Sequence, residues 1–213
     1  MRLKLGTKVR CTDATGCELA DVVVDPLARQ VTHLVVRPSG PDEAARLVPI
    51  ALASSTGAGD EISLDCTLGE LTAFETAGEF AILPIGEVPP TGEDWDLGVE
   101  DAVSVPSFDA VEFGDYSADL SSTVGVSYDR VPRGTVELRR TSIVAAADGQ
   151  PVGNLDSISL EGTAITHVTF QRGHLWWRRD VSIPIESTAS VATDLVTASL
   201  STEEIDALPA VKA

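Results

Sequence analysis

The residue types best suited to binding a partner are concentrated in the segment RGHLWWRRD at Arg172–Asp180. The candidate interaction patch consists of His174, Trp176, Trp177, Arg178 and Arg179. Tryptophan and arginine dominate protein interfaces, because the indole buries much apolar area and the guanidinium stacks or pairs bidentately. The alternative is a hairpin loop in which one tryptophan closes a core and the arginines are solvated. Because side chains alternate along a strand, we expect one of Trp176 and Trp177 to be buried and the other partly exposed.

A second group of cations, Arg130, Arg133, Arg139 and Arg140, could extend this patch. The chain, however, has 15 Lys and Arg against 33 Asp and Glu, a formal net charge of −18. Such a charge has the wrong sign for general phosphate binding and makes nucleic acid an unfavourable partner. Pairing of these arginines with acidic residues of the same chain is therefore the favoured interpretation.

His33 and His167 each follow a threonine, but one histidine in each segment is too few for a zinc centre. We predict a structural hydrogen bond from each imidazole to a loop carbonyl. The G-x-S-x-G, H-E-x-x-H, P-loop and G-x-G-x-x-G patterns are absent, as is a calcium loop. We therefore predict no enzyme activity and no catalytic, cofactor or metal residues. An unfamiliar active site would need a concave pocket between the two barrels with convergent polar groups.

Cys11, Cys17 and Cys66 are odd in number and lack C-x-x-C spacing, so we expect buried thiols rather than disulfides or a zinc knuckle. The first ten residues lack an apolar core typical of a signal peptide. No stretch approaches the ~18 apolar residues needed to cross a bilayer. The sequence thus predicts a cytoplasmic protein without a transmembrane segment.

The elements that position these residues repeat with an offset of about 134 residues, a sign of structural duplication. In the first copy, Asp25 and Pro26 separate two β-branched runs in DVVVDPLARQVTHLVV, which predicts a hairpin. In the second copy, Glu161 and Gly162 play the same part in NLDSISLEGTAITHVTF. Each hairpin leads to a short strand with a proline, Pro49 or Pro184, which predicts a sheet edge or a bulge.

Both copies end in a brief strand and a capped helix. The expected strands are Ile62–Leu64 and Val196–Ala198. Thr67 with Glu70, and Ser201 with Glu204, form S/T-x-x-E capping boxes, which predict helices of two or three turns. The helices should end at Gly78 and near Pro209 and present an apolar face through Leu71 and Phe74, or Ile205 and Leu208.

The segment between the copies is acidic and rich in proline and glycine. No Lys or Arg occurs from Leu47 to Asp129, a stretch with 17 Asp and Glu. We predict an irregular but partly ordered connector, with local disorder around Pro89–Asp96. The side chains expected to pin it onto a module are Ile82, Leu83, Ile85, Trp95, Val103, Val105, Phe108, Val111, Phe113 and Tyr116.

Several of these segments resemble the PRC-barrel superfamily, whose members share a small six-stranded barrel followed by a short helix. The resemblance lies in KVRCTDATGCELADVVVDP, VTHLVVRP and LVPI in the first copy. In the second it lies in VPRGTVELRRTSIVAAADGQPVG, ITHVTFQRGHLWWRRDVSIPI and STEEIDALP, which look like tandem PRC-barrel proteins of bacteria. The superfamily includes the cytoplasmic domain of the reaction-centre H subunit, the C-terminal domain of a ribosome maturation factor and archaeal cell-division proteins. The resemblance implies protein contact as the common theme.

Together these features predict a mainly β protein of two small PRC-type β-barrels in tandem, each followed by a short helix. The expected divisions are a first module at residues 1–77, the connector at 78–132 and a second module at 133–213. We expect a non-enzymatic interaction or scaffold protein that binds a protein partner, with a second copy of itself among the candidates. The alternative is an RNA- or ribosome-associated maturation-type factor, suggested by the arginine and tryptophan patch.

Overall fold

The computed structural model describes residues 1–39, 44–55, 61–84, 87–103, 123–173 and 178–211. Within these ranges the chain is mainly β, with two six-residue α-helices, which confirms the predicted class. The strands of the first repeat are β1 (Arg2–Lys4), β2 (Lys8–Arg10), β3 (Thr15–Asp25), β4 (Gln30–Arg37), β5 (Arg46–Pro49), β6 (Ala53–Ser55) and β7 (Ile62–Leu64). Those of the second are β11 (Val136–Arg139), β12 (Ile143–Ala145), β13 (Pro151–Glu161), β14 (Ala164–Arg172), β15 (Arg179–Pro184), β16 (Thr188–Ala192) and β17 (Leu195–Ala198).

Each repeat arranges six of its strands in the same order. The first runs β6-β7-β2-β3-β4-β5 and the second β16-β17-β12-β13-β14-β15. Both predicted hairpins are present, since β3 pairs with β4 and β13 with β14, both antiparallel. Among the described strands β5 pairs only with β4, and β15 only with β14, so Pro49 and Pro184 lie on sheet edges as predicted. The 3₁₀ turns η1 (Ile50–Leu52) and η2 (Ile185–Ser187) follow them, and the described pairings include no closed ring.

Both capping boxes are confirmed at the starts of α1 (Leu68–Ala73) and α2 (Thr202–Ala207). Leu71 and Ile205 are fully buried, and Phe74 and Leu208 pack against the same core. The second helix ends at Ala207, near Pro209 as predicted, whereas the first is shorter than predicted. The first ends at Ala73 rather than Gly78, because Phe74 is already extended and the Ala77 N–H donates to the Ala45 carbonyl at 2.8 Å.

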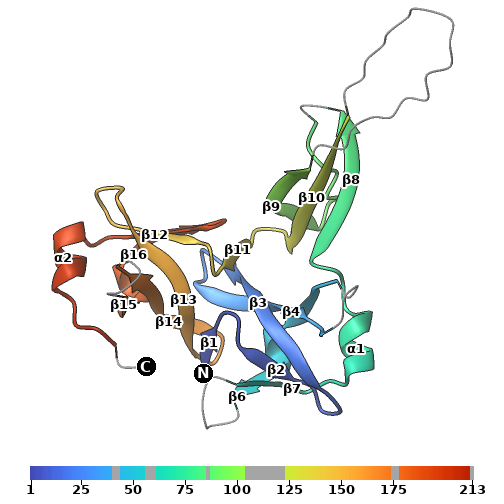
Figure 1. Ribbon diagram of the computed structural model, residues 1–213, viewed down its shortest axis with the longest axis horizontal. Helices are drawn as coiled ribbons and strands as arrows, with labels where there is room; N and C mark the ends of the chain where they lie inside the picture. Colours follow the sequence, from blue (N-terminus) through green and yellow to red (C-terminus); the bar gives the residue numbers. More distant parts are fainter. Residues whose placement is uncertain (40–43, 56–60, 85–86, 104–122, 174–177, 212–213) are drawn as a thin grey trace, which may run out of the picture.

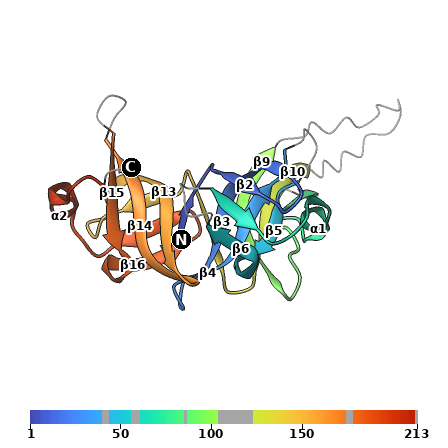
Figure 2. The same cartoon turned by 90° about the horizontal axis from the view of Figure 1, so that it is seen from below.

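The two repeats exchange their first strands, which the tandem arrangement did not anticipate. Strand β1 pairs with β13 of the second repeat, and β11 pairs with β3 of the first. Leu3 lies opposite Ile158, and Leu138 lies opposite Val22, with all four side chains buried. The N-terminus consequently lies at the junction of the repeats (Figure 2). One core cluster contains residues of both repeats.

The connector contains a second sheet of three strands, β8 (Gly78–Pro84), β10 (Thr123–Pro132) and β9 (Trp95–Val103), in that order. We call these three strands the arm, which projects from the first repeat (Figure 1). The expectation of an irregular connector is therefore wrong for these segments. Seven residues of β8 pair with β10 in an unshifted register, from Gly78–Asp129 to Pro84–Thr123. Residues 87–94, by contrast, contain no strand or helix.

A small second core fixes the base of the arm. Val23, Val35 and Leu47 on the outer face of β3, β4 and β5 pack with Ala77 and Val131, and Trp95 packs against this cluster. The prediction that Trp95 pins the connector to a module is confirmed.

Candidate functional site

Two members of the candidate interaction patch lie within the described residues, whereas His174, Trp176 and Trp177 lie outside them. Arg178 is exposed. The guanidinium of Arg179 donates to the Leu208 carbonyl at 3.2 Å and to the Asp206 carbonyl at 2.9 Å. Arg179 therefore holds the β14–β15 hairpin to the end of α2.

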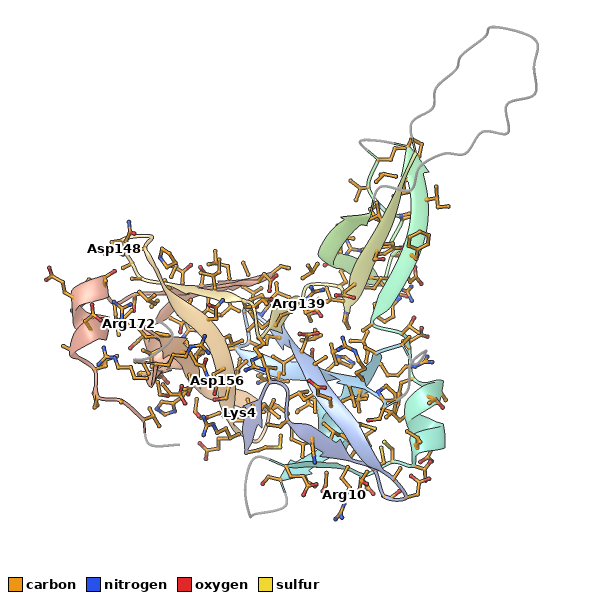
Figure 3. The ribbon with its side chains drawn as sticks, in the orientation of Figure 1. Lys4, Arg10, Arg139, Asp148, Asp156 and Arg172 are labelled. Atoms are coloured by element: carbon orange, nitrogen blue, oxygen red, sulfur yellow. The ribbon has the colours of Figure 1, made fainter. Side chains whose placement is uncertain are left out.

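The neighbouring Arg172 has a similar structural role. It lies beside α2 (Figure 3) and forms a bidentate pair with Asp206, at 2.6 and 2.7 Å. The hydrogen bonds from Arg172 lower the pKa of Asp206. Arg172 and Arg179 thus both contact Asp206 of α2.

The predicted internal pairing of the second arginine group is confirmed for Arg130 and Arg139. Arg130 lies 2.9 Å from Glu79 and sits over the Trp95 ring at 4.8 Å from the centroid. Arg139 pairs with Asp129 at the base of the arm (Figure 3). These two cations pair with Glu79 and Asp129, two acidic residues of the connector.

The predicted hydrogen bond of His33 is not formed by Nδ1, which is buried without a partner. Desolvation lowers the pKa of His33, so the neutral imidazole is favoured. His167 is exposed at the matching position. Among the described residues, no group of three or more His, Cys, Asp or Glu is placed to hold a metal ion.

A buried carboxyl group lies where the arm meets the first repeat. Glu137 in β11 is 1% exposed, and neither of its oxygens has a hydrogen-bond partner. Its Oε2 lies 4.0 Å from Nε of Arg139, too far for a hydrogen bond. A Cβ at Gly98 of β9 would stand 2.9 Å from Oε2, so glycine permits this close approach of the arm.

Burial raises the pKa of Glu137 to about 8, and the carboxylates of Asp129 and Asp21 add to the rise. Burial likewise raises the pKa of Asp21 to about 6, against the lowering effect of Arg139. A protonated Glu137 is favoured at neutral pH, which explains how an unpaired carboxyl is tolerated there. Because so little of it is exposed, Glu137 is not placed to react with a solute.

A hollow of about 600 Å³ opens between the first repeat and the arm. Its lining includes Asp21, Val35, Phe80, Tyr128 and Arg139. This is a concave site with convergent polar groups, and its lining also includes Arg139, Arg140 and Thr141 from the start of the second repeat.

The arm presents an apolar surface beside this hollow. Phe80 is 58% exposed and Ile82 61%, and both lie on one face of β8 because side chains alternate along a strand. The prediction that Ile82 pins the connector onto a module is therefore wrong. Phe80 was not among the predicted residues. The run FAIL at 80–83 is apolar on both faces, which could have indicated that one face needs a further partner.

No protein-family model matches this chain, and no curated protein matches it significantly. No helix in the described ranges is long and apolar enough to cross a membrane.

Proposed function

We propose that this chain is a non-enzymatic interaction scaffold, in which two PRC-barrel-like modules hold the arm in place for a protein partner. The observation that carries this proposal is the exposed apolar face of Phe80 and Ile82 on a strand at the edge of the arm. Scattered exposed apolar residues are ordinary, but neighbouring ones on a single face mark an interaction surface.

The order of strands supports the assignment to the PRC-barrel type. In each repeat the six-strand path ends in strands that are consecutive in the chain, β5 and β6 or β15 and β16. The parallel pairs β2–β7 and β12–β17 bring an early strand of each repeat beside its last strand. The PRC-barrel resemblance implies a six-stranded path of this kind, with end strands that are consecutive in the chain, followed by a capped helix. On this proposal residues 1–77 and 133–213 form the modules.

The base of the arm is well fixed, which favours binding. Trp95 and Val131 pack on the outer face of the first repeat, and the Arg130 N–H donates to the Ala77 carbonyl at 2.7 Å. A surface held in place before binding loses less conformational entropy when a partner docks.

The described arginines give little support to the alternative of an RNA- or ribosome-associated factor. Arg130, Arg139, Arg172 and Arg179 all contact acidic residues or backbone carbonyls of this chain. We propose a cytoplasmic location for the scaffold, in keeping with the burial of Cys11, Cys17 and Cys66 in its core.

Affinity purification from native cells tests the proposal. The Phe80→Ser/Ile82→Ser variant is compared with Leu27→Ser, a matched control because Leu27 is 94% exposed on the β3–β4 turn, outside the arm. We expect wild type and the control to retain a partner that the double variant loses by about tenfold or more. Equal recovery with all three proteins, or no partner together with a monomeric mass, would overturn the proposal. Recovery of ribosomal particles that is lost at high salt would favour the RNA alternative.

A further inference from the structure

Strand β8 has an open edge. Among the described strands β8 pairs only with β10, so no described strand is hydrogen-bonded to its other side. In Figure 1 this side faces outward from the arm. Edge strands present unpaired N–H and C=O groups that can pair with another chain.

The features that usually protect such an edge are lacking. Natural edge strands are shielded by lysines, prolines or bulges. Strand β8 contains no Lys or Arg, its single proline is its last residue, Pro84, and its register with β10 is unshifted. Strand β9, at the other edge of the same sheet, has a register irregularity opposite Tyr128–Arg130.

The apolar face beside this edge has room for further side chains. Ser127 lies opposite Phe80 and Gly125 opposite Ile82, and residues directly opposite in an antiparallel pair share a face. These small neighbours leave Phe80 and Ile82 uncovered from the β10 side. Alternate side chains of an added strand could pack on them.

The acidic residues around the β8 edge favour a cationic partner. Residues 78–132 contain twelve Asp and Glu but only one basic residue, Arg130, which lies 2.9 Å from Glu79 and 3.8 Å from the preceding Glu75. The exposed Glu75 precedes β8, and Glu87 follows it, with its N–H bonded to the Pro84 carbonyl at 3.1 Å. A second copy of a chain at −18 would be repelled, whereas a cationic segment would be attracted.

We infer that β8 binds an extended cationic segment of a partner protein by strand addition, with apolar side chains on Phe80 and Ile82 and lysines or arginines near Glu75 and Glu87. This inference rests on the proposed function and names the partner's chemistry. Backbone pairing supplies the binding geometry, and the acidic residues supply selectivity.

Fluorescence anisotropy with short labelled peptides tests the inference. The probe alternates lysine and valine, and the controls replace every lysine by glutamate or every valine by proline. We expect the lysine–valine peptide to bind, to weaken by about tenfold or more as salt is raised, and to slow amide exchange in residues 79–83. The glutamate and proline peptides should bind at least about tenfold more weakly.

The variant Ile82→Lys should abolish this binding, because it adds a cation to the edge. Leu27→Lys is the matched control and should leave binding unchanged. Equal binding by the glutamate peptide, no effect of Ile82→Lys, or slowed exchange outside β8 would overturn the inference. If an arm-dependent cellular partner is recovered but the lysine–valine peptide fails to bind, strand addition is wrong while the scaffold function stands. A melting temperature of Ile82→Lys close to that of wild type shows that the arm remains folded.

Discussion

At the scale of single residues, Glu137 shows how the arm changes one repeat relative to the other. Leu138 pairs with Val22 as Leu3 pairs with Ile158, so these two leucines are equivalent in the exchanged strands. The residues that precede them, Glu137 in β11 and Arg2 in β1, are therefore counterparts. Arg2 reaches solvent and donates to Ser157 Oγ at 3.0 Å, whereas Glu137 lies beneath β9 without a hydrogen-bond partner. The same position is therefore hydrogen-bonded and partly exposed in one repeat, and buried without a hydrogen-bond partner in the other.

Replacing Glu137 by Gln should make the protein less sensitive to rising pH. The pKa of Glu137 is raised to about 8 in the folded state from an ordinary value near 4.5, so folding favours its protonated form. The contribution of protonated Glu137 to the free energy of unfolding is fully present below about pH 4.5 and is lost as the pH rises through about 8. The wild type should lose up to about 1.4 kcal/mol per pH unit in this window relative to Glu137→Gln.

Urea unfolding at about pH 5 and about pH 8 measures this difference, with the exposed Glu18→Gln as control. If the free energies of unfolding of wild type and Glu137→Gln differ by the same amount at both pH values, the pKa of Glu137 is not raised and the prediction is wrong.

Urea unfolding also measures how much the two capping hydroxyls stabilise the protein. Ser201 Oγ accepts the Glu204 N–H at 3.3 Å, and Thr67 Oγ1 accepts the Glu70 N–H at 3.2 Å. Ser201→Ala and Thr67→Ala should each reduce the free energy of unfolding by about 1 kcal/mol. Ser190→Ala, an exposed strand position, should have no comparable effect. A loss for Ser190→Ala as large as for the two caps would show that the loss does not come from capping.

At the scale of elements, local sequence signals predicted the hairpins, the proline edge strands and the capping boxes, since turn residues and caps act within a few positions. The strand exchange could not be predicted. It joins Arg2–Lys4 to Ser157–Ser159, and nothing in a three-residue strand specifies so distant a partner. The exposed site was missed for a related reason, because FAIL at 80–83 does not reveal which apolar face is covered.

The strand exchange predicts that a mutation in one repeat weakens the other. Leu3→Ala should cost about 2–5 kcal/mol and speed amide exchange in β13, the strand that Leu3 covers. Leu138→Ala should have a similar cost and act on β3. Hydrogen exchange resolved by strand checks both variants. Faster exchange confined to the repeat that carries the mutation would rule out the exchange.

At the scale of the whole molecule, duplication has produced two different outer faces. Facing positions on β4 and β5 are Val35 and Leu47, whereas the matching pair on β14 and β15 is Thr169 and Ser182. The apolar face carries the arm, and the polar face does not. The repeats therefore supply the support, and the arm supplies the binding surface that we propose.

Site-specific photo-crosslinking in native cells tests this division of roles most directly. A benzophenone amino acid is placed at position 82 on the arm or at position 27 on a hairpin turn, where the native side chain is even more exposed. Our account predicts a discrete crosslinked partner from position 82 and none from position 27. Crosslinking from position 27 but not from position 82 would contradict the claim that the arm is the docking surface.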